Sequence, residues 1–157
     1  MNEYKEARDP ETPPERLAEL AQDRYFGVRR EVAQNPNTPT EVLAQLAGDE
    51  NFIVRRGVAW NTNSPPELLT QLAGDEDRFA RRNVAGNPNT PVDDLVMLAG
   101  DVDRYVRGDV AENPNTPISI LTLLTLEKDE YVVQAAHKAL KTRSQSTVAW
   151  MMNGNGL

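Results

Sequence analysis

Near-copies of the pentapeptide Asn-Pro-Asn-Thr-Pro return along this chain every 26 residues, and this spacing constrains the fold more than any other feature. Residues 35–39, 87–91 and 113–117 carry the pentapeptide unchanged, whereas residues 9–13 and 61–65 carry altered versions. A repeat of roughly 20 to 50 residues is typical of a solenoid, in which each unit is one supersecondary element stacked on its neighbours. We therefore expect a rod of stacked repeats.

Each repeat contains signals for two short helices. In the second repeat, Thr38 stands at a predicted N-cap with Glu41 three residues later as its capping-box partner, and Gly48 follows as a candidate left-handed C-cap. A second helix then ends at the asparagine before the next proline-type turn. Apolar residues lie at helical spacing in both predicted helices: Leu43, Leu46 and Ala47, then Val54, Val58 and Ala59. Helices this short are marginal alone, so each pair must be buried against the next.

The whole chain is expected to form a single repeat domain. Residues 1–8 are interpreted as the end of a partial repeat, and residues 139–152 as a C-terminal cap helix that covers the last interface with Val148, Trp150 and Met151. Residues 153–157 are expected to be a loose tail. The five recognisable repeats are 9–34, 35–60, 61–86, 87–112 and 113–138.

Composition removes several classes of site. The 157 residues include no cysteine, which excludes disulfides, thiolate metal sites and iron–sulfur ligation. The single histidine, His137, cannot build a histidine cluster, and it replaces a repeated alanine at the end of the array. No nucleophile stands beside a base, and no glycine loop suits a phosphate. We therefore predict no catalytic residue, no metal site, no cofactor and no enzyme activity.

Charge and hydropathy also narrow the class of partner. The formal net charge of −7 disfavours nucleic acid, because binding to phosphate backbones is driven by basic surface. No apolar run approaches the roughly 18 residues of a membrane span, and residues 1–5 lack the features of a signal peptide. We expect a cytoplasmic protein that does not bind membranes.

The pattern NPNTPxxxLxxLAGDxxxxVRRxVA, carried most cleanly by residues 35–59 and 87–111, resembles the leucine-rich repeat variant family of bacterial proteins. The resemblance covers roughly residues 9–138. It implies an all-α, right-handed α-solenoid of about five two-helix repeats, related to HEAT repeats, in which the second helix of each pair can be short or of 3₁₀ type. The best-known member carries an iron–sulfur module, which this cysteine-free chain cannot reproduce. The motif implies a fold and leaves function open.

Two sets of polar columns repeat with the pentapeptide. An aspartate stands six residues before an arginine in each of four repeats, and we predict that each arginine forks onto a carboxylate of its own or the adjacent unit as a structural ladder. An anion-binding ladder is the alternative. The aspartates are Asp23, Asp49, Asp75 and Asp101, and the arginines are Arg29, Arg55, Arg81 and Arg107. The asparagines of the pentapeptide are expected to satisfy backbone groups of the loop and of the neighbouring unit.

A different set of columns changes from repeat to repeat. These positions face away from the inward stripe of the second helix, and they hold the aromatic and arginine residues that are enriched at protein interfaces. Whether the aromatic rings are exposed or wedge between adjacent helices is left open. The predicted partner-binding residues are Arg30, Ile53, Arg56, Trp60, Phe79, Arg82 and Tyr105.

The leading hypothesis is a noncatalytic scaffold that binds a protein or peptide through this variable face. One alternative is a HEAT-like nucleic-acid-binding or DNA-repair type protein, which would retain DNA in a salt-sensitive way. Another is a purely structural repeat segment of a larger protein.

Overall fold

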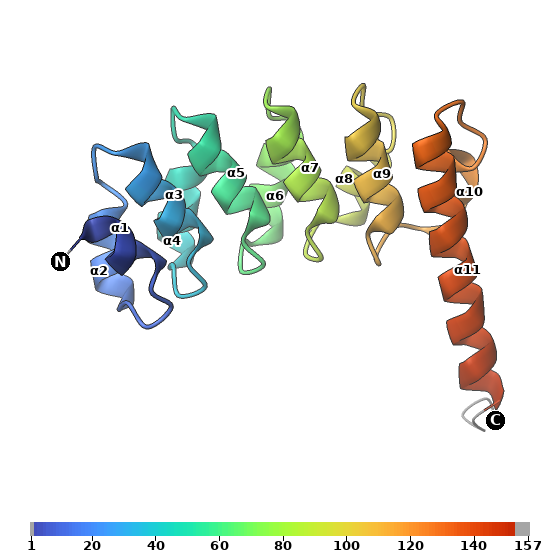
Figure 1. The fold of residues 1–157 in the computed structure, drawn as a ribbon, viewed down its shortest axis with the longest axis horizontal. Helices are drawn as coiled ribbons and strands as arrows, with labels where there is room; N and C mark the ends of the chain where they lie inside the picture. The colour runs from blue at the N-terminus through green and yellow to red at the C-terminus, as the bar shows by residue number, and fades with distance from the viewer. Residues whose placement is uncertain (1, 153–157) are drawn as a thin grey trace.

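The fold is a row of stacked helix pairs without strands in the part of the chain that is described (Figure 1). The computed structural model describes the backbone of residues 2–152 and the side chains of residues 2–145. The second helices of successive repeats lie side by side and pack directly on one another, and the first helices lie behind them in Figure 1. The tail expected at 153–157, and the side chains of Val148, Trp150 and Met151, lie outside the described residues.

Each repeat contributes one helix to each of the two rows. The first-helix row consists of α2 (Pro14–Leu20), α4 (Thr40–Ala47), α6 (Pro66–Ala73), α8 (Val92–Leu98) and α10 (Ile118–Leu124). The second-helix row begins with the lone helix α1 (Glu3–Arg8) of the partial repeat and continues with α3 (Phe26–Gln34), α5 (Phe52–Trp60), α7 (Arg78–Gly86), α9 (Arg104–Glu112) and α11 (Glu130–Met152).

The core is a thin layer between the two rows. Leucines of the first helices, such as Leu43 and Leu46, and valines of the second helices, such as Val54 and Val58, are at most 1% exposed, as their helical spacing predicts. The all-α solenoid of 26-residue repeats is confirmed. The second helices are short, with nine residues in each of α3, α5, α7 and α9, but they are α-helices and not 3₁₀ helices.

The threonine side chain of the pentapeptide bonds to the end of the preceding helix. The Thr38 hydroxyl is buried and donates to the Val32 carbonyl at 2.5 Å, and Ser64 does the same to Val58 at 2.7 Å. The predicted capping box is therefore wrong: α4 starts at Thr40, and its N-cap residue is Pro39, which provides no side-chain cap. The physical reason is that the last carbonyls of a helix lack N–H partners, and a buried hydroxyl is the nearest donor. Gly48 has φ −100°, so the predicted left-handed C-cap is also wrong.

The first asparagine of the pentapeptide ties each repeat to the one before it. The buried amide of Asn87 donates to the carbonyls of Ala59 at 2.9 Å and Asn61 at 3.0 Å, while its oxygen accepts the N–H of Asn89. The second asparagine reaches the same neighbour, since Asn89 donates to the Thr62 carbonyl at 2.6 Å. These bonds satisfy backbone groups at the turn, which is the structural role predicted for the asparagines.

The arginine column forms a second ladder, which joins each repeat to the one after it. Arg55 donates Nε to Asp75 at 2.6 Å and Nη2 at 3.0 Å, and its Nη1 donates to the Asp49 carbonyl at 2.9 Å. Burial alone raises the pKa of Asp75, but the Arg55 fork and a backbone N–H lower it more, so this pKa lies below its ordinary value. The equivalent pairs are Arg29 with Asp49, Arg81 with Asp101, and Arg107 with Glu127 in place of an aspartate.

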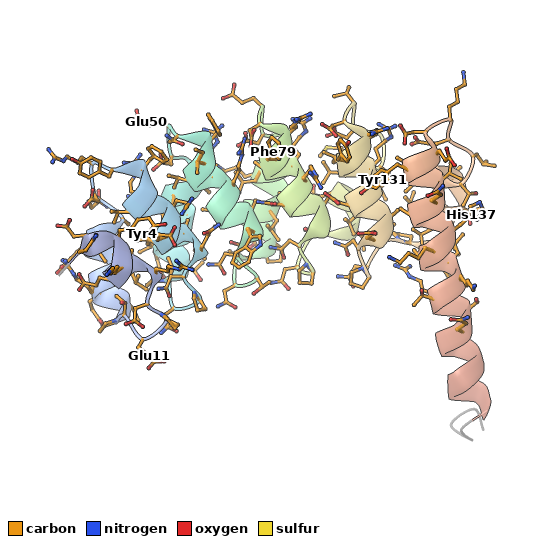
Figure 2. The ribbon with its side chains drawn as sticks, viewed as in Figure 1. Tyr4, Glu11, Glu50, Phe79, Tyr131 and His137 are labelled. Atoms are coloured by element: carbon orange, nitrogen blue, oxygen red, sulfur yellow. The ribbon has the colours of Figure 1, made fainter. Side chains whose placement is uncertain are left out.

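The C-terminal helix differs from the other second helices. Residues 139–152, predicted as a separate cap helix, continue α11 without a break. Arg143 donates to the carbonyls of Asn113 and Pro114 at 2.9 and 2.8 Å, which are two of the acceptors that a fifth pair of asparagines would take. His137 is exposed on the side of α11 away from α9 (Figure 2), whereas the equivalent Ala111 is buried by the following repeat. The regular stacking therefore stops at α11.

Candidate partner-binding site

The predicted binding residues lie on α3, α5, α7 and α9, so the stacking of the second helices brings them into one row. Figure 2 shows Tyr4, Phe79 and Tyr131 at successive places along this row. Phe79 and Tyr105 are each 37% exposed, and Ile53 on α5 is half-buried. The row is thus a continuous surface whose aromatic rings are partly covered.

Arg56 is the link between the second and third repeats. Its guanidinium lies 4.7 Å from the ring centre of Phe52 and 4.3 Å from that of Phe79, which places it between two aromatic faces. It also forks onto Asp77 of the next repeat at 2.5 and 2.8 Å. Burial raises the pKa of Asp77, but the fork and backbone N–H groups lower it more. An arginine with these contacts stabilises the stack and has few donors left for a partner.

Arg82 repeats this arrangement one unit further along. Its Nε donates to Asp109 at 2.8 Å, and its guanidinium lies 5.2 Å from the ring centre of Tyr105. Tyr105 in turn meets Tyr131 edge to face, with ring centres 5.5 Å apart. Burial raises the pKa of Asp109 despite the opposing effect of Arg82, whereas the pKa of Asp77 lies below its ordinary value.

Arg30 is also held within the chain. It donates to Glu31 and, at 2.9 Å, to the Tyr4 hydroxyl on α1. The three arginines predicted to bind a partner therefore form intramolecular contacts in this structure. Their sequence neighbours could have signalled this, because an acidic residue stands at the right place in the same or following repeat.

Trp60 is the most exposed of the predicted aromatic residues. It is the last residue of α5, its side chain is 59% exposed, and it stands between two surface hollows. The first hollow, of about 420 Å³, is lined by Tyr4, Arg8, Arg30, Glu31, Gln34 and Pro36. The second, of about 370 Å³, is lined by Thr62, Arg82, Asn83, Gly86, Pro88 and Asp109. We call these two hollows and Trp60 the Trp60 groove.

Small residues keep this row tightly stacked. A Cβ on Gly57 would lie 2.9 Å from the Ala33 Cβ and 3.3 Å from the Arg30 carbonyl oxygen. A Cβ on Gly108 would lie 2.3 Å from the Tyr131 ring. Glycine is required at these two positions because the neighbouring second helix or ring approaches the backbone directly. Part of the variation in the columns of Gly57 and Gly108 therefore reflects packing between neighbouring second helices.

Sequence reasoning missed a second surface on the first-helix row. Large apolar side chains of α8, α10 and the following turn are exposed, and the column of Met97 and Leu123 is polar in the three earlier repeats, as Glu19, Gln45 and Gln71. A comparison of the first-helix columns between repeats could have found it. The side chains are Val92, Val96, Met97, Ile118, Leu123 and Leu126, and we call them the first-helix apolar patch.

The stacked helix pairs and the two ladders define an α-solenoid repeat protein. Residues 26–51 and 78–103 match the model of the family described as leucine rich repeat variant. The chain is also similar to a solved structure described as a leucine-rich repeat variant with a novel repetitive protein structural motif, with 29% identity and a TM-score of 0.65. That similarity covers 78% of this chain and 49% of the other, so the chain spans about half the length of that protein. No curated protein matches.

These two matches confirm the resemblance to the leucine-rich repeat variant family that residues 35–59 and 87–111 indicated. The chain is therefore a helical repeat protein that resembles the leucine-rich repeat variant family. No helix among the described residues is long and apolar enough to cross a bilayer.

Proposed function

We propose that the chain is a noncatalytic interaction scaffold that binds an extended peptide segment of a partner protein in the Trp60 groove. The observation that carries the proposal is the 59% exposed indole of Trp60 between two hollows at the C-terminal ends of the second helices. Exposed tryptophans in a concave setting are typical hot spots of protein interfaces.

The dimensions of the groove suit a short extended segment. The two hollows lie on either side of α5 and reach from Gln34 on α3 to Gly86 on α7. Two helix spacings correspond to about 20 Å, which an extended chain covers in about six residues. Pro36 and Pro88 add rigid apolar walls, one in each hollow.

The charges of the groove favour a peptide over a nucleic acid. Arg82 is neutralised by Asp109, and Arg30 contacts Glu31. Phosphate binding needs basic side chains that can release counterions, and these two are already paired. We therefore favour a peptide over a nucleic acid in this groove.

The test compares proteins captured from lysate of the native organism by the immobilised wild type, Trp60→Ala and Tyr25→Ala. Tyr25 is a matched control, because it is also 59% exposed but lies at the N-terminal end of α3, whereas Trp60 lies at the C-terminal end of α5. We expect a specific protein to be retained by the wild type and Tyr25→Ala and lost from Trp60→Ala. The same captured set on all three proteins would refute the choice of groove.

A further inference from the structure

A third hollow continues the Trp60 groove along the C-terminal ends of the second helices. Its volume is about 600 Å³, and it lies between the end of α9 and one side of α11. We call it the α11 hollow. The residues that line it include Glu112, Pro114, Ala135, Lys138, Ala139 and Arg143.

The three hollows occupy the same position of the repeat. Arg8 lines the first hollow, Trp60 the second and Glu112 the third, and each of these residues follows the one before it by two repeats. The same spacing relates Gln34, Gly86 and Lys138, which line the three hollows in the same order. Neighbouring second helices pack about 8–10 Å apart, so the hollows follow one another along one edge at intervals of about 20 Å.

The extension of α11 forms the end of this line of hollows. Figure 1 shows α11 continuing past the level at which the other second helices end. The equivalent helix α9 ends at Glu112, whereas α11 continues to Met152. Arg143 ties the extension to the preceding turn by donating to the carbonyls of Asn113 and Pro114. The α11 hollow is therefore a corner between this turn and the side of the helix.

The extension of α11 is basic, although the chain as a whole is acidic. Residues 131–157 contain no aspartate or glutamate, whereas they include Lys138, Lys141 and Arg143. Lys138 and Lys141 lie about one turn apart on α11, and both are exposed. On a chain with a formal net charge of −7, this concentration of positive charge favours an anionic partner at this place.

The two carboxylates that α9 contributes to this edge each face a basic side chain. Asp109 in the second hollow accepts from Arg82 at 2.8 Å. Glu112 in the α11 hollow lies 3.8 Å from the Lys138 ammonium, and this exposed pair is weak enough to open for a partner. Arg143 donates to neutral carbonyls, and these bonds orient its guanidinium without neutralising its charge. Two basic side chains and one acidic side chain thus line the α11 hollow.

We propose that the peptide segment bound in the Trp60 groove continues into the α11 hollow and is acidic at that end, where its carboxylates meet Lys138 and Lys141. This inference rests on the proposed function of the Trp60 groove. Three helix spacings separate α5 from α11, about 27 Å, which an extended chain covers in about eight residues. The partner segment therefore carries aspartate or glutamate about eight positions from the residue that contacts Trp60.

The lining of the α11 hollow favours an acidic peptide over a nucleic acid. Pro114 and the half-buried Ala139 place apolar surface beside Lys138, which suits the mixed side chains of a peptide. Strong binding to a phosphate backbone requires many basic contacts that release counterions, and the extension of α11 supplies few. An acidic peptide needs only a few charge contacts, because the Trp60 groove contributes the rest of the binding.

The test selects binders from a displayed library of random peptides of about 12 residues, a length that spans the Trp60 groove and the α11 hollow. The immobilised full-length proteins are the wild type, Trp60→Ala, and Lys138→Gln with Lys141→Gln. The matched control is Lys5→Gln with Lys128→Gln, which removes the same charge from exposed lysines on α1 and in the turn before α11.

We expect the peptides selected on the wild type to be enriched in aspartate and glutamate toward one end. The labelled peptide selected most often is then titrated with each protein by fluorescence polarisation. Its affinity should fall about 3- to 30-fold for Lys138→Gln with Lys141→Gln, as the loss of two exposed charge pairs predicts, and stay unchanged for the control. Trp60→Ala should lose the peptide.

The outcomes separate this inference from the function of the groove. Selected peptides without acidic enrichment, or equal affinity for the wild type and the folded Lys138→Gln, Lys141→Gln variant, would overturn the inference and leave the Trp60 groove as a peptide site. Unchanged binding to Trp60→Ala, or no selected peptide at all, would refute the proposed function and the inference with it.

Two further measurements complete the test. A labelled single-stranded DNA of about 12 nucleotides that binds the wild type more tightly than the selected peptide and displaces it would replace the peptide with a nucleic acid. Circular dichroism checks that each variant is folded. If the double variant unfolds, Lys141→Gln alone replaces it, with an expected loss of affinity of about two- to fivefold, and an unchanged affinity would again overturn the inference.

Discussion

Replacing Arg81 with alanine should destabilise the solenoid through the ladder between the third and fourth repeats. Arg81 donates Nε and Nη2 to Asp101 at 2.6 and 3.1 Å, and Nη1 to the Asp75 carbonyl at 2.8 Å. The side chains of Arg81 and Asp101 are 15% and 7% exposed. Without Arg81, the Asp101 carboxylate remains nearly buried and loses its counter-ion, a change that costs about 3–5 kcal/mol in buried pairs.

We expect the lower end of that range, about 3 kcal/mol, because the pair lies at the edge of a thin core. For a chain of this length, the loss corresponds to a melting temperature lower by about 6 to 12 °C. The assay is thermal unfolding followed by circular dichroism. Arg78→Ala on the same helix is the control. Its ion pair with Asp103 at 3.2 Å and its contact with the Phe79 ring at 4.8 Å both lie at the surface, and each is worth at most about 1 kcal/mol. A melting temperature of Arg81→Ala equal to that of Arg78→Ala would refute the ladder as a source of stability.

Three further predictions concern stability. Asn87→Ala leaves two buried carbonyls without donors and should cost about 2–4 kcal/mol in urea unfolding, whereas Asn89→Ala removes one exposed bond and should cost less than about 1 kcal/mol. Gly57→Ala should destabilise by about 1–2 kcal/mol because its Cβ meets Ala33 and a backbone carbonyl, whereas Gly86→Ala, with nothing within 4 Å, should be neutral or stabilising. A higher urea midpoint for Gly57→Ala than for Gly86→Ala would contradict this packing. Burial raises the pKa of Asp101, but Arg81 and a backbone N–H lower it more, so the folded pKa is below the unfolded one. The stability from this pair is therefore full above about pH 4 and is lost as the pH falls through the lowered pKa, and melts of Asp101→Asn should show a shallower loss in acid than the wild type.

The fold could be predicted from the sequence because its determinants recur in every repeat. The 26-residue spacing and the buried Leu43 and Val54 columns place both helix rows without any tertiary information. The local chemistry of the turn could not be assigned in the same way. Thr38 has the spacing of an N-cap, but burial beside the end of α3 directs its hydroxyl to the Val32 carbonyl, and sequence alone does not show which helix end is nearer.

The candidate site was less predictable, because exposure depends on contacts between repeats. Arg56 and Trp60 both belong to variable columns, yet Arg56 is enclosed by Phe52, Phe79 and Asp77 while Trp60 is exposed. A helical periodicity tells which side of a helix faces away from the core. It does not tell which of those side chains the next repeat will cover.

The central claim is that columns which repeat build the solenoid, whereas Trp60 in a variable column binds the partner. The most direct test measures capture of the partner and melting temperature for Trp60→Ala and Arg81→Ala in the same experiment. We predict that Trp60→Ala loses capture at an unchanged melting temperature, and that Arg81→Ala melts lower but retains capture below its melting point. Retained capture by Trp60→Ala together with lost capture by folded Arg81→Ala would contradict the claim.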